Sequence, residues 1–247
     1  IMNETAKKRN VLEACLHEGR LNMLRSLEKR LNECQKGLSN YLETKRDAFP
    51  RFFFISDDEL LAILGGNGAS SVQQYMQNMF ENCELLVFKD GTNLITGMMS
   101  KETESYQFNT PIPAEGPVEK WLNHVKDEMR RTLKTKTKQG VFYYPKKPRI
   151  QWIKDQLGMV TLAGSQIWWT WEVEDAFRRV KKGEKMAVKN LAVKLTNQLN
   201  NLVDEVRAPQ DLIAQLKLRT LIIVDVHARD IVDNLVRDSI LDEREFE

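Results

Sequence analysis

The sequence predicts a mainly α-helical protein: an elongated rod or bundle of several helices with a small antiparallel β-meander inserted between them. Two observations carry this prediction. Apolar residues recur at steps of three and four over most of the chain, which is the spacing of one helix face. Between residues 83 and 110 the pattern changes to short apolar runs separated by Asp90-Gly91 and by a polar segment, which is typical of hairpins.

Residues 1–48 are expected to form one long helix, with Gly19 as its candidate interruption. Its apolar positions follow the a/d spacing of a packed helix; they are Leu24, Leu27, Leu31, Cys34, Leu38 and Tyr41. Two interpretations stay open. The seam either packs against neighbouring helices of the same chain, which the short length of the repeat favours, or pairs with a second copy as a coiled coil.

Residues 49–82 are expected to be a connector with short helices. The run at 51–55 suits a buried strand or an extended link, and Ser56 with Glu59 forms a capping box that opens a helix. Three glycines at 65–68 are not followed by the GK[ST] of a phosphate loop. A second short helix is expected at 71–80.

The remaining segments are a β-meander at 83–110, whose edges must be covered, and a helical part at 117–247. Prolines at 145, 148 and 209 divide that part, and we expect helices at 118–138, at 150–156, from 158 onward, around 188–206 and at 210–241. The apolar run at 221–224 is expected to be helical because the helical period resumes on both sides.

Three of the five tryptophans, Trp168, Trp169 and Trp171, lie within four consecutive positions. A core, a ligand platform and a partner surface are the three explanations for such a cluster. On a helix the three rings fall on two faces, which disfavours a single flat stacking platform. We therefore expect all three to be buried and to clamp their helix between neighbouring layers, with Gly164 admitting a close neighbour.

The segment 129–154 contains nine Lys or Arg and no Asp or Glu, and four aromatic residues lie among them: Phe142, Tyr143, Tyr144 and Trp152. Basic residues interleaved with aromatics occur in nucleic-acid binding proteins, whereas the simpler interpretation is a solvated surface that faces an acidic one. The candidate residues of this electrostatic contact patch are Arg130, Arg131, Lys134, Lys136, Lys146, Lys147 and Arg149. Near the end of the chain, an exposed helix face linked by ion pairs is expected from Asp225, Arg229, Asp230 and Asp233.

Composition and motifs argue against several classes of function. The net charge of +2 gives no overall attraction to nucleic acid or membranes, and the longest apolar run is far shorter than the ~20 residues of a membrane span. The three cysteines include no CxxC pair, which indicates reduced thiols in an intracellular protein. None of the common catalytic or metal-binding motifs is present, so we expect no catalytic residue, cofactor or metal in this chain.

The start at Ile1 rather than Met indicates a piece of something longer.

Three separated segments resemble dynein heavy chains: FPRFFFISDDELLAIL at 49–64, GSQIWWTWEVEDAF at 164–177 and DVHARDIV at 225–232. They occur in this order and at about this spacing in the linker region just before the motor ring, and the resemblance covers almost the whole chain. IWWT at 167–170 resembles the axonemal branch of the family. The alternatives from other classes are a coiled-coil or helical scaffold without a motor role and a nucleic-acid binder.

The resemblance implies a lever joined at its C-terminal end to the first AAA module, which bends and straightens as the parent motor hydrolyses ATP. ATP and Mg²⁺ would bind elsewhere in the parent chain, and this segment would have no ATPase activity. Arg229 and Asp230, together with Asp225 and Asp233, would anchor the lever to the ring. Expected partners are the AAA ring of the same heavy chain and other heavy, intermediate and light chains, with microtubules reached only through the parent motor and with neither nucleic acid nor membrane. The expected location is the cytoplasm and cytoskeleton, in the axoneme of a cilium or flagellum.

Overall fold

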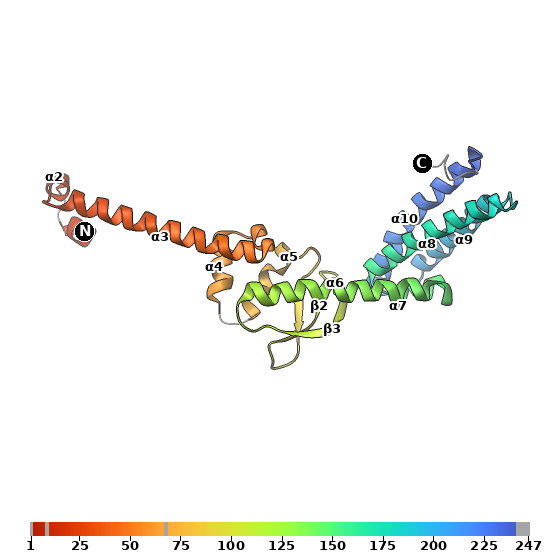
Figure 1. Ribbon diagram of the computed structural model, residues 1–247, viewed down its shortest axis with the longest axis horizontal. Coiled ribbons are helices and arrows are strands. Elements are labelled where there is room, and N and C mark those ends of the chain that lie inside the picture. Colours follow the sequence, from red (N-terminus) through yellow and green to blue (C-terminus); the bar gives the residue numbers. More distant parts are fainter. Residues whose placement is uncertain (1, 8–9, 67–68, 241–247) are drawn as a thin grey trace. The chain divides into compact units, whose positions relative to one another are not determined.

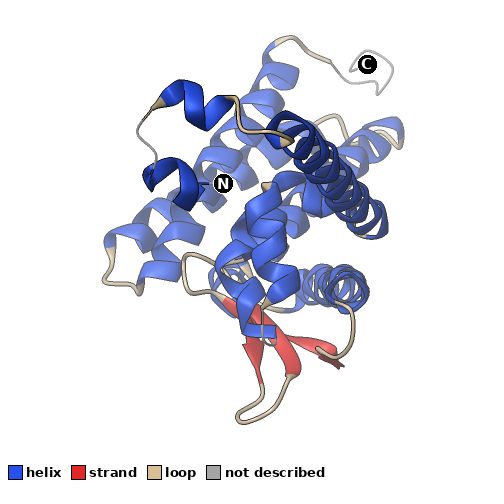
Figure 2. Ribbon diagram, turned by 90° about the vertical axis from the view of Figure 1, so that its left-hand side faces the viewer, coloured by secondary structure: helices blue, strands red, loops and turns tan. Residues whose placement is uncertain are grey.

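The computed structural model describes residues 2–7, 10–66 and 69–240, and the chain divides into two compact units. The first unit comprises residues 1–81 with 114–123, and the second comprises residues 82–113 with 124–247. Most described residues are helical, and one small antiparallel sheet lies in the second unit (Figures 1 and 2). The predicted class, mainly α with a small β-meander, is confirmed.

In the first unit the segment 1–48 forms three helices rather than one: α1 (Met2–Lys7), α2 (Val11–Cys15) and α3 (Arg20–Ala48). The side chain of Asn10 caps α2 by accepting a hydrogen bond from a backbone N–H of its first turn. Gly19, which directly precedes α3, has φ +76°, a left-handed conformation that does not continue a right-handed helix. The predicted interruption near Gly19 is confirmed, and the single long helix is limited to α3.

The apolar seam of α3 is exposed. Leu31 is 68% exposed and Tyr41 is 48% exposed, while Leu42, near the end of the helix, is buried. Packing of α3 is concentrated at this end, where it contacts the 3₁₀ turn η1 (Pro50–Phe54). The prediction that other helices of the same chain cover the seam is therefore wrong for the residues that the structure describes.

The aromatic run after α3 is neither a strand nor extended, because η1 is a 3₁₀ turn that begins at Pro50. In a 3₁₀ turn, positions three apart lie on the same side. This geometry buries both Phe49 and Phe52, whose ring centroids are 4.9 Å apart in an edge-to-face contact. An alternating strand would place these two side chains on opposite faces.

The remaining short helices of the first unit largely follow the prediction. The capping box is confirmed: Ser56 Oγ accepts from the backbone N–H of Glu59, and the Glu59 carboxylate accepts from the backbone N–H of Ser56. The segment expected as one short helix is a 3₁₀ turn followed by one helical turn. The three elements are α4 (Asp57–Gly65), η2 (Ala69–Tyr75) and α5 (Met76–Met79).

The sheet of the second unit is the predicted meander, with antiparallel strands in the order β1-β2-β3. The strands are β1 (Leu85–Phe88), β2 (Leu94–Met99) and β3 (Ser105–Pro113), the last being longer than expected. The register between β2 and β3 shifts near Gly97. A Cβ at this position would lie 2.3 Å from the carbonyl oxygen of Tyr106, so only glycine fits here.

Helix α6 (Val118–Tyr143) binds backbone groups of β3 within the second unit, in the irregular part of the strand between Gln107 and Ile112. The backbone N–H groups of Asn109 and Thr110 donate to Thr132 Oγ1 and Glu128 Oε1, each at 3.0 Å. The Thr132 hydroxyl in turn donates to Glu128 at 3.1 Å. Backbone N–H groups that β2 leaves without a partner are therefore satisfied by the helix.

The rest of the second unit is helical, with the elements η3 (Tyr144–Lys146), α7 (Arg149–Asp155), α8 (Gly158–Lys181), α9 (Ala187–Arg207) and α10 (Leu212–Arg237). The run at 221–224 lies inside α10, so the helical interpretation of this segment is confirmed. Helices α8, α9 and α10 lie side by side (Figure 1). One apolar cluster joins these three helices, and a second joins α7 to α9 and α10 through Trp152, Ile153, Leu202, Leu218 and Leu221.

Candidate functional site: an aromatic clamp and two polar locks

The three clustered tryptophans lie on two sides of α8. Trp169 packs against the apolar cluster shared by α8, α9 and α10. Trp168 and Trp171 contact each other edge to face, with ring centroids 5.3 Å apart. Trp171 is 48% exposed and lies under the guanidinium of Arg178, and Trp168 and Trp169 are only partly buried, so the expectation that all three rings are buried is wrong. Trp171 lies at the rim of the aromatic cluster rather than inside it.

An aromatic clamp, formed by Tyr144, Trp152, Gly164 and Trp168, joins α7 and α8 to the end of α6. The Trp168 ring stacks on Tyr144 at 5.3 Å and 13°, and Tyr144 meets Trp152 edge to face at 4.9 Å. Trp152 is fully buried. Such aromatic pairs contribute about 0.5–1.5 kcal/mol each beyond the area they bury.

The two indole nitrogens of the clamp cap the C-terminus of α6. Trp152 Nε1 donates to the carbonyl oxygen of Gly140 at 2.8 Å, and Trp168 Nε1 donates to that of Val141 at 3.0 Å. The last four carbonyls of a helix have no partner inside the helix, and these two belong to that set because α6 ends at Tyr143. The clamp therefore packs α7 and α8 against the end of α6 and also satisfies two carbonyl groups at that end.

Gly164 belongs to the clamp because of its missing side chain. A Cβ at this position would lie 2.9 Å from Cζ2 and 3.1 Å from Cη2 of Trp152. The close neighbour expected from the sequence is therefore present, and it is Trp152 of α7. Two aromatic residues of the basic segment, Tyr144 and Trp152, are thus part of the packing, whereas Phe142 and Tyr143 are 57% and 42% exposed and lie under Lys146 and Lys147.

The first polar lock is the ion pair between Arg149 of α7 and Asp225 of α10, in which the guanidinium donates to both carboxylate oxygens at 2.5 and 3.0 Å. Each side chain is only 14% exposed. Burial disfavours the charged guanidinium, but the hydrogen bonds and charge of Asp225 outweigh it, so the pKa of Arg149 is raised above its ordinary value. Burial also raises the pKa of the neighbouring Tyr144 hydroxyl. Removing one partner of such a pair costs about 3–5 kcal/mol, because the other charge stays buried.

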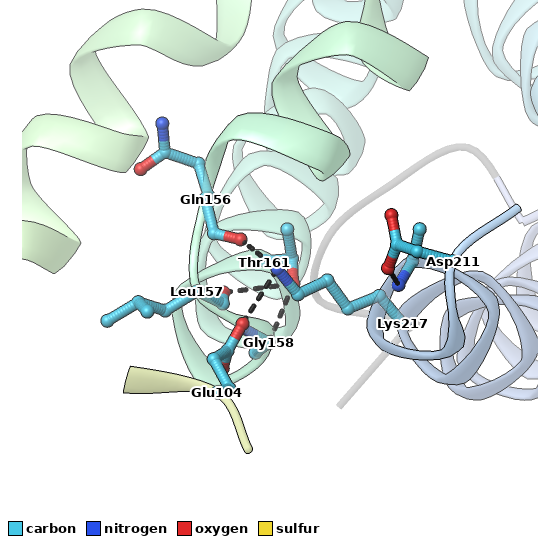
Figure 3. A network of polar contacts seen from close by, with 8 residues as sticks. Glu104, Gln156, Leu157, Gly158, Thr161, Asp211 and Lys217 are labelled. Atoms are coloured by element: carbon cyan, nitrogen blue, oxygen red, sulfur yellow. Dashed lines mark hydrogen bonds and ion pairs between the residues drawn. The ribbon is translucent and has the colours of Figure 1, made fainter. Parts of the chain in front are cut away.

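The second polar lock attaches the sheet to α8 and α10 through Glu104, in the turn between β2 and β3 (Figure 3). Its carboxylate accepts from the backbone N–H of Gly158, the first residue of α8, at 2.9 Å. Lys217 of α10 lies 2.7 Å from the same carboxylate and also donates to the carbonyl oxygen of Gln156 at 2.6 Å. A carboxylate at a helix N-terminus is stabilised by the free N–H groups and by the helix dipole. A single side chain therefore links three elements.

The candidate basic patch is partly neutralised by partners inside the chain. Arg149 is in the first lock, Arg131 lies 2.9 Å from Glu128, and Lys147 lies 2.5 Å from Asp155. Lys146 lies over the ring of Phe142, 3.3 Å from its centroid. The structure distributes the other candidates, Arg130, Lys134 and Lys136, along α6.

The candidate anchoring residues lie on α10, but they do not form one face. Arg229 lies 2.6 Å from Asp230 and 3.7 Å from Asp233, which gives the expected exposed set of ion pairs. The expectation that Asp225 belongs to this exposed face is wrong, because its carboxylate pairs with Arg149 and is shielded from solvent. Within one helix the sequence cannot distinguish an acid that faces water from one that meets a basic residue of another helix.

Several residues of the site could not be singled out from the sequence. Glu104 and Lys217 join segments that are distant in the chain, and Gly140 offers its carbonyl rather than a side chain. The one available signal was Gly164, because a glycine inside an apolar helix indicates a close neighbour. Among the described residues no cluster of His, Cys, Asp or Glu could hold a metal ion, and none of the described helices is long and apolar enough to cross a membrane.

Comparison with known proteins gives a consistent set of relatives. The family model "Dynein heavy chain, N-terminal region 2" matches residues 1–140. The chain is 56% identical over 84% of its length to the Dynein-1-alpha heavy chain of the flagellar inner arm I1 complex from Chlamydomonas reinhardtii. It is 46% identical over its full length to human Dynein axonemal heavy chain 10, and 39% identical over 96% to the ciliary Dynein beta chain from Tripneustes gratilla. It spans only 4% to 6% of the lengths of these relatives.

Proposed function

Because the chain belongs to the dynein heavy chain family, we propose that it is the C-terminal part of the motor's linker, a lever that bends and straightens to convert ATPase states of the ring into movement along microtubules. Relatives with axonemal, ciliary and flagellar names support a place in the axoneme of a cilium or flagellum. ATP and Mg²⁺ bind elsewhere in the parent heavy chain, and this segment has no ATPase activity of its own. Its partners are the AAA ring of the same chain and, through the complex, other heavy, intermediate and light chains.

One observation carries the mechanical role: the clamp and the two locks join the sheet, the end of α6, α7, α8 and α10 at separate points of one unit. A lever transmits force only if its elements do not slide past one another. Close packing resists such sliding, since a well-packed interior deforms little. Both locks, and the bond from Trp168 to the end of α6 within the clamp, join elements that are not adjacent along the chain, which loop connections alone would leave free to move.

The second lock offers a direct test of this role. In the parent heavy chain, Glu104→Ala removes the acceptor at the start of α8 and leaves Lys217 without its carboxylate. We expect slower microtubule gliding with ATP turnover retained, because the lever is loosened while the ring is untouched. Glu102→Ala, in the same turn between β2 and β3, is the matched control and should leave gliding unchanged. Equal gliding by the two variants would contradict the mechanical role of the lock.

The anchoring role of α10 is a separate part of the proposal. Arg229, Asp230 and Asp233 form an exposed set of charges that is suited to contact with the ring. Reversing the charges of Arg229 and Asp230 in the parent motor should slow ATP-driven gliding. Unchanged gliding would dismiss the anchoring role and leave the rest of the proposal intact.

A helical scaffold without a motor role is the second candidate, and the exposed seam of α3 is the observation that favours it. Leu31 and Leu38 are 68% and 44% exposed, as expected of a helix that meets another chain. The scaffold interpretation predicts that the 247-residue chain dimerises in sedimentation experiments and that Leu31→Glu with Leu38→Glu abolishes the dimer. A monomer at all accessible concentrations would dismiss it.

A further inference from the structure

Three polar atoms next to the first lock have no hydrogen-bond partner in the part of the chain that the structure describes. They are Arg149 Nε on α7 and Ser165 Oγ and Trp169 Nε1 on α8, and all three are shielded from solvent. Buried polar groups are almost always hydrogen-bonded, so an unpartnered one calls for an explanation. Here all three residues line the same small cavity. Their coincidence indicates a common partner.

The size of the cavity limits what that partner is. Its volume of about 10 Å³ is close to the minimum that a single water molecule needs. A larger ligand, such as a phosphate or an organic molecule, does not fit. The candidates are therefore one water molecule and one monatomic ion.

The donors and acceptors around the cavity select water. The Arg149 Nε–H and the Trp169 indole N–H can only donate. The Ser165 and Tyr144 hydroxyls and the Gln198 amide, which also line the cavity, offer both donors and acceptors. Two fixed donors disfavour a cation. A halide would accept from them, but the carboxylates of Glu172 and Asp225 also line the cavity, and Asp225 already balances the charge of Arg149. A water molecule accepts two hydrogen bonds and donates two, which matches this mixed lining.

We propose that this cavity holds one ordered water molecule that accepts hydrogen bonds from Arg149 Nε and Trp169 Nε1 and shares a third with Ser165 Oγ. The water bridges α7 and α8 directly beside the ion pair that joins α7 to α10. It gives Trp169 a polar role in addition to its packing against α9 and α10. This site does not depend on the motor function proposed above.

A crystal structure of the 247-residue chain, at a resolution that shows ordered waters, tests the proposal. We expect one density peak within hydrogen-bond distance of Arg149 Nε and Trp169 Nε1, without anomalous signal after a bromide soak. The peak should be lost in the variant Trp169→Phe with Ser165→Ala and retained in Trp171→Phe, the matched control on the exposed rim. A bromide signal at the site, an absent peak, or direct pairing of the three atoms with other protein groups would overturn the proposal.

A solution measurement on the same chain with ¹⁵N-labelled tryptophan gives an independent readout. The indole N–H of Trp169 should show magnetisation transfer with a long-lived water. Those of Trp152 and Trp168 serve as internal controls, because their donors are bonded to carbonyl oxygens at 2.8 and 3.0 Å. The same weak transfer for all three indoles would contradict the bridging water.

Discussion

The contact between Gly164 and Trp152 gives a quantitative test of the clamp through the variant Gly164→Ala. The added methyl would lie 2.9 Å from Trp152 Cζ2, well inside van der Waals contact. The indole cannot easily move aside, because it is fully buried and its nitrogen is bonded to the carbonyl of Gly140. The change therefore forces either the ring or the backbone of α8 to shift.

Two opposing effects set the magnitude. Alanine is the better helix former, which stabilises α8 by about 1 kcal/mol relative to glycine. Overpacking a well-packed core costs about 1–3 kcal/mol. The net expectation is a loss of up to ~2 kcal/mol in the free energy of unfolding. Gly158→Ala in the same helix is the matched control, since its Cβ would approach nothing closer than 3.5 Å, and it should cost no stability.

Urea unfolding followed by tryptophan fluorescence and circular dichroism measures both variants. The clash itself is isolated by repeating Gly164→Ala in a Trp152→Phe background, where the smaller ring leaves room for the methyl. Coupling between the two positions should then reduce the cost of the alanine. If Gly164→Ala stabilises the chain as much as Gly158→Ala, or if its cost is the same in both backgrounds, the reasoning about the clamp is refuted.

Three further predictions concern the ion pairs and the thiols. Arg149→Met should cost about 3–5 kcal/mol in urea unfolding, while Arg149→Met with Asp225→Leu should cost much less, and equal losses would contradict a buried pair. Burial raises the pKa of Cys83 to about 12, so at pH 8 roughly one thiol in ten thousand is ionised. A thiol reagent should therefore label the exposed Cys34 rapidly and the buried Cys83 only on unfolding. A hydrogen bond from Lys154 of α7 lowers the pKa of Glu205. The stability that the ionised Glu205 contributes is therefore present above its ordinary pKa of 4.5 and is lost as the pH falls below that value. The difference in stability between the native chain and Glu205→Gln should therefore shrink on acidification. A difference that persists at low pH would contradict a stabilising Lys154–Glu205 ion pair.

Local features of the fold were predictable because their causes are local. The Asp90-Gly91 turn predicts the meander, and Ser56 with Glu59 predicts the start of α4. The residues of the run at 51–55 favour a strand or an extended link. The 3₁₀ turn forms instead because it buries Phe49 and Phe52 together, a tertiary effect that overrides local preference.

The site was less predictable, because its contacts join residues that are distant in the sequence. Glu104 accepts from Gly158, 54 positions away, and Arg149 donates to Asp225, 76 positions away. Charge patterns along one segment carry no information about such partners. For the same reason the sequence predicts an exposed Asp225, although its pairing with Arg149 of α7 shields it from solvent.

The most direct test of the mechanical account is microtubule gliding by the parent heavy chain carrying Trp169→Ala. This change removes a partly buried ring that packs on the cluster joining α8, α9 and α10, so its cost should lie below the ~3–5 kcal/mol that Trp→Ala typically costs in a core. The account predicts that gliding slows strongly while ATP turnover by the ring is retained, with Trp171→Ala at the exposed rim having a smaller effect. Loss of ATP turnover in a variant whose fold is intact, or gliding at the native speed, would contradict it.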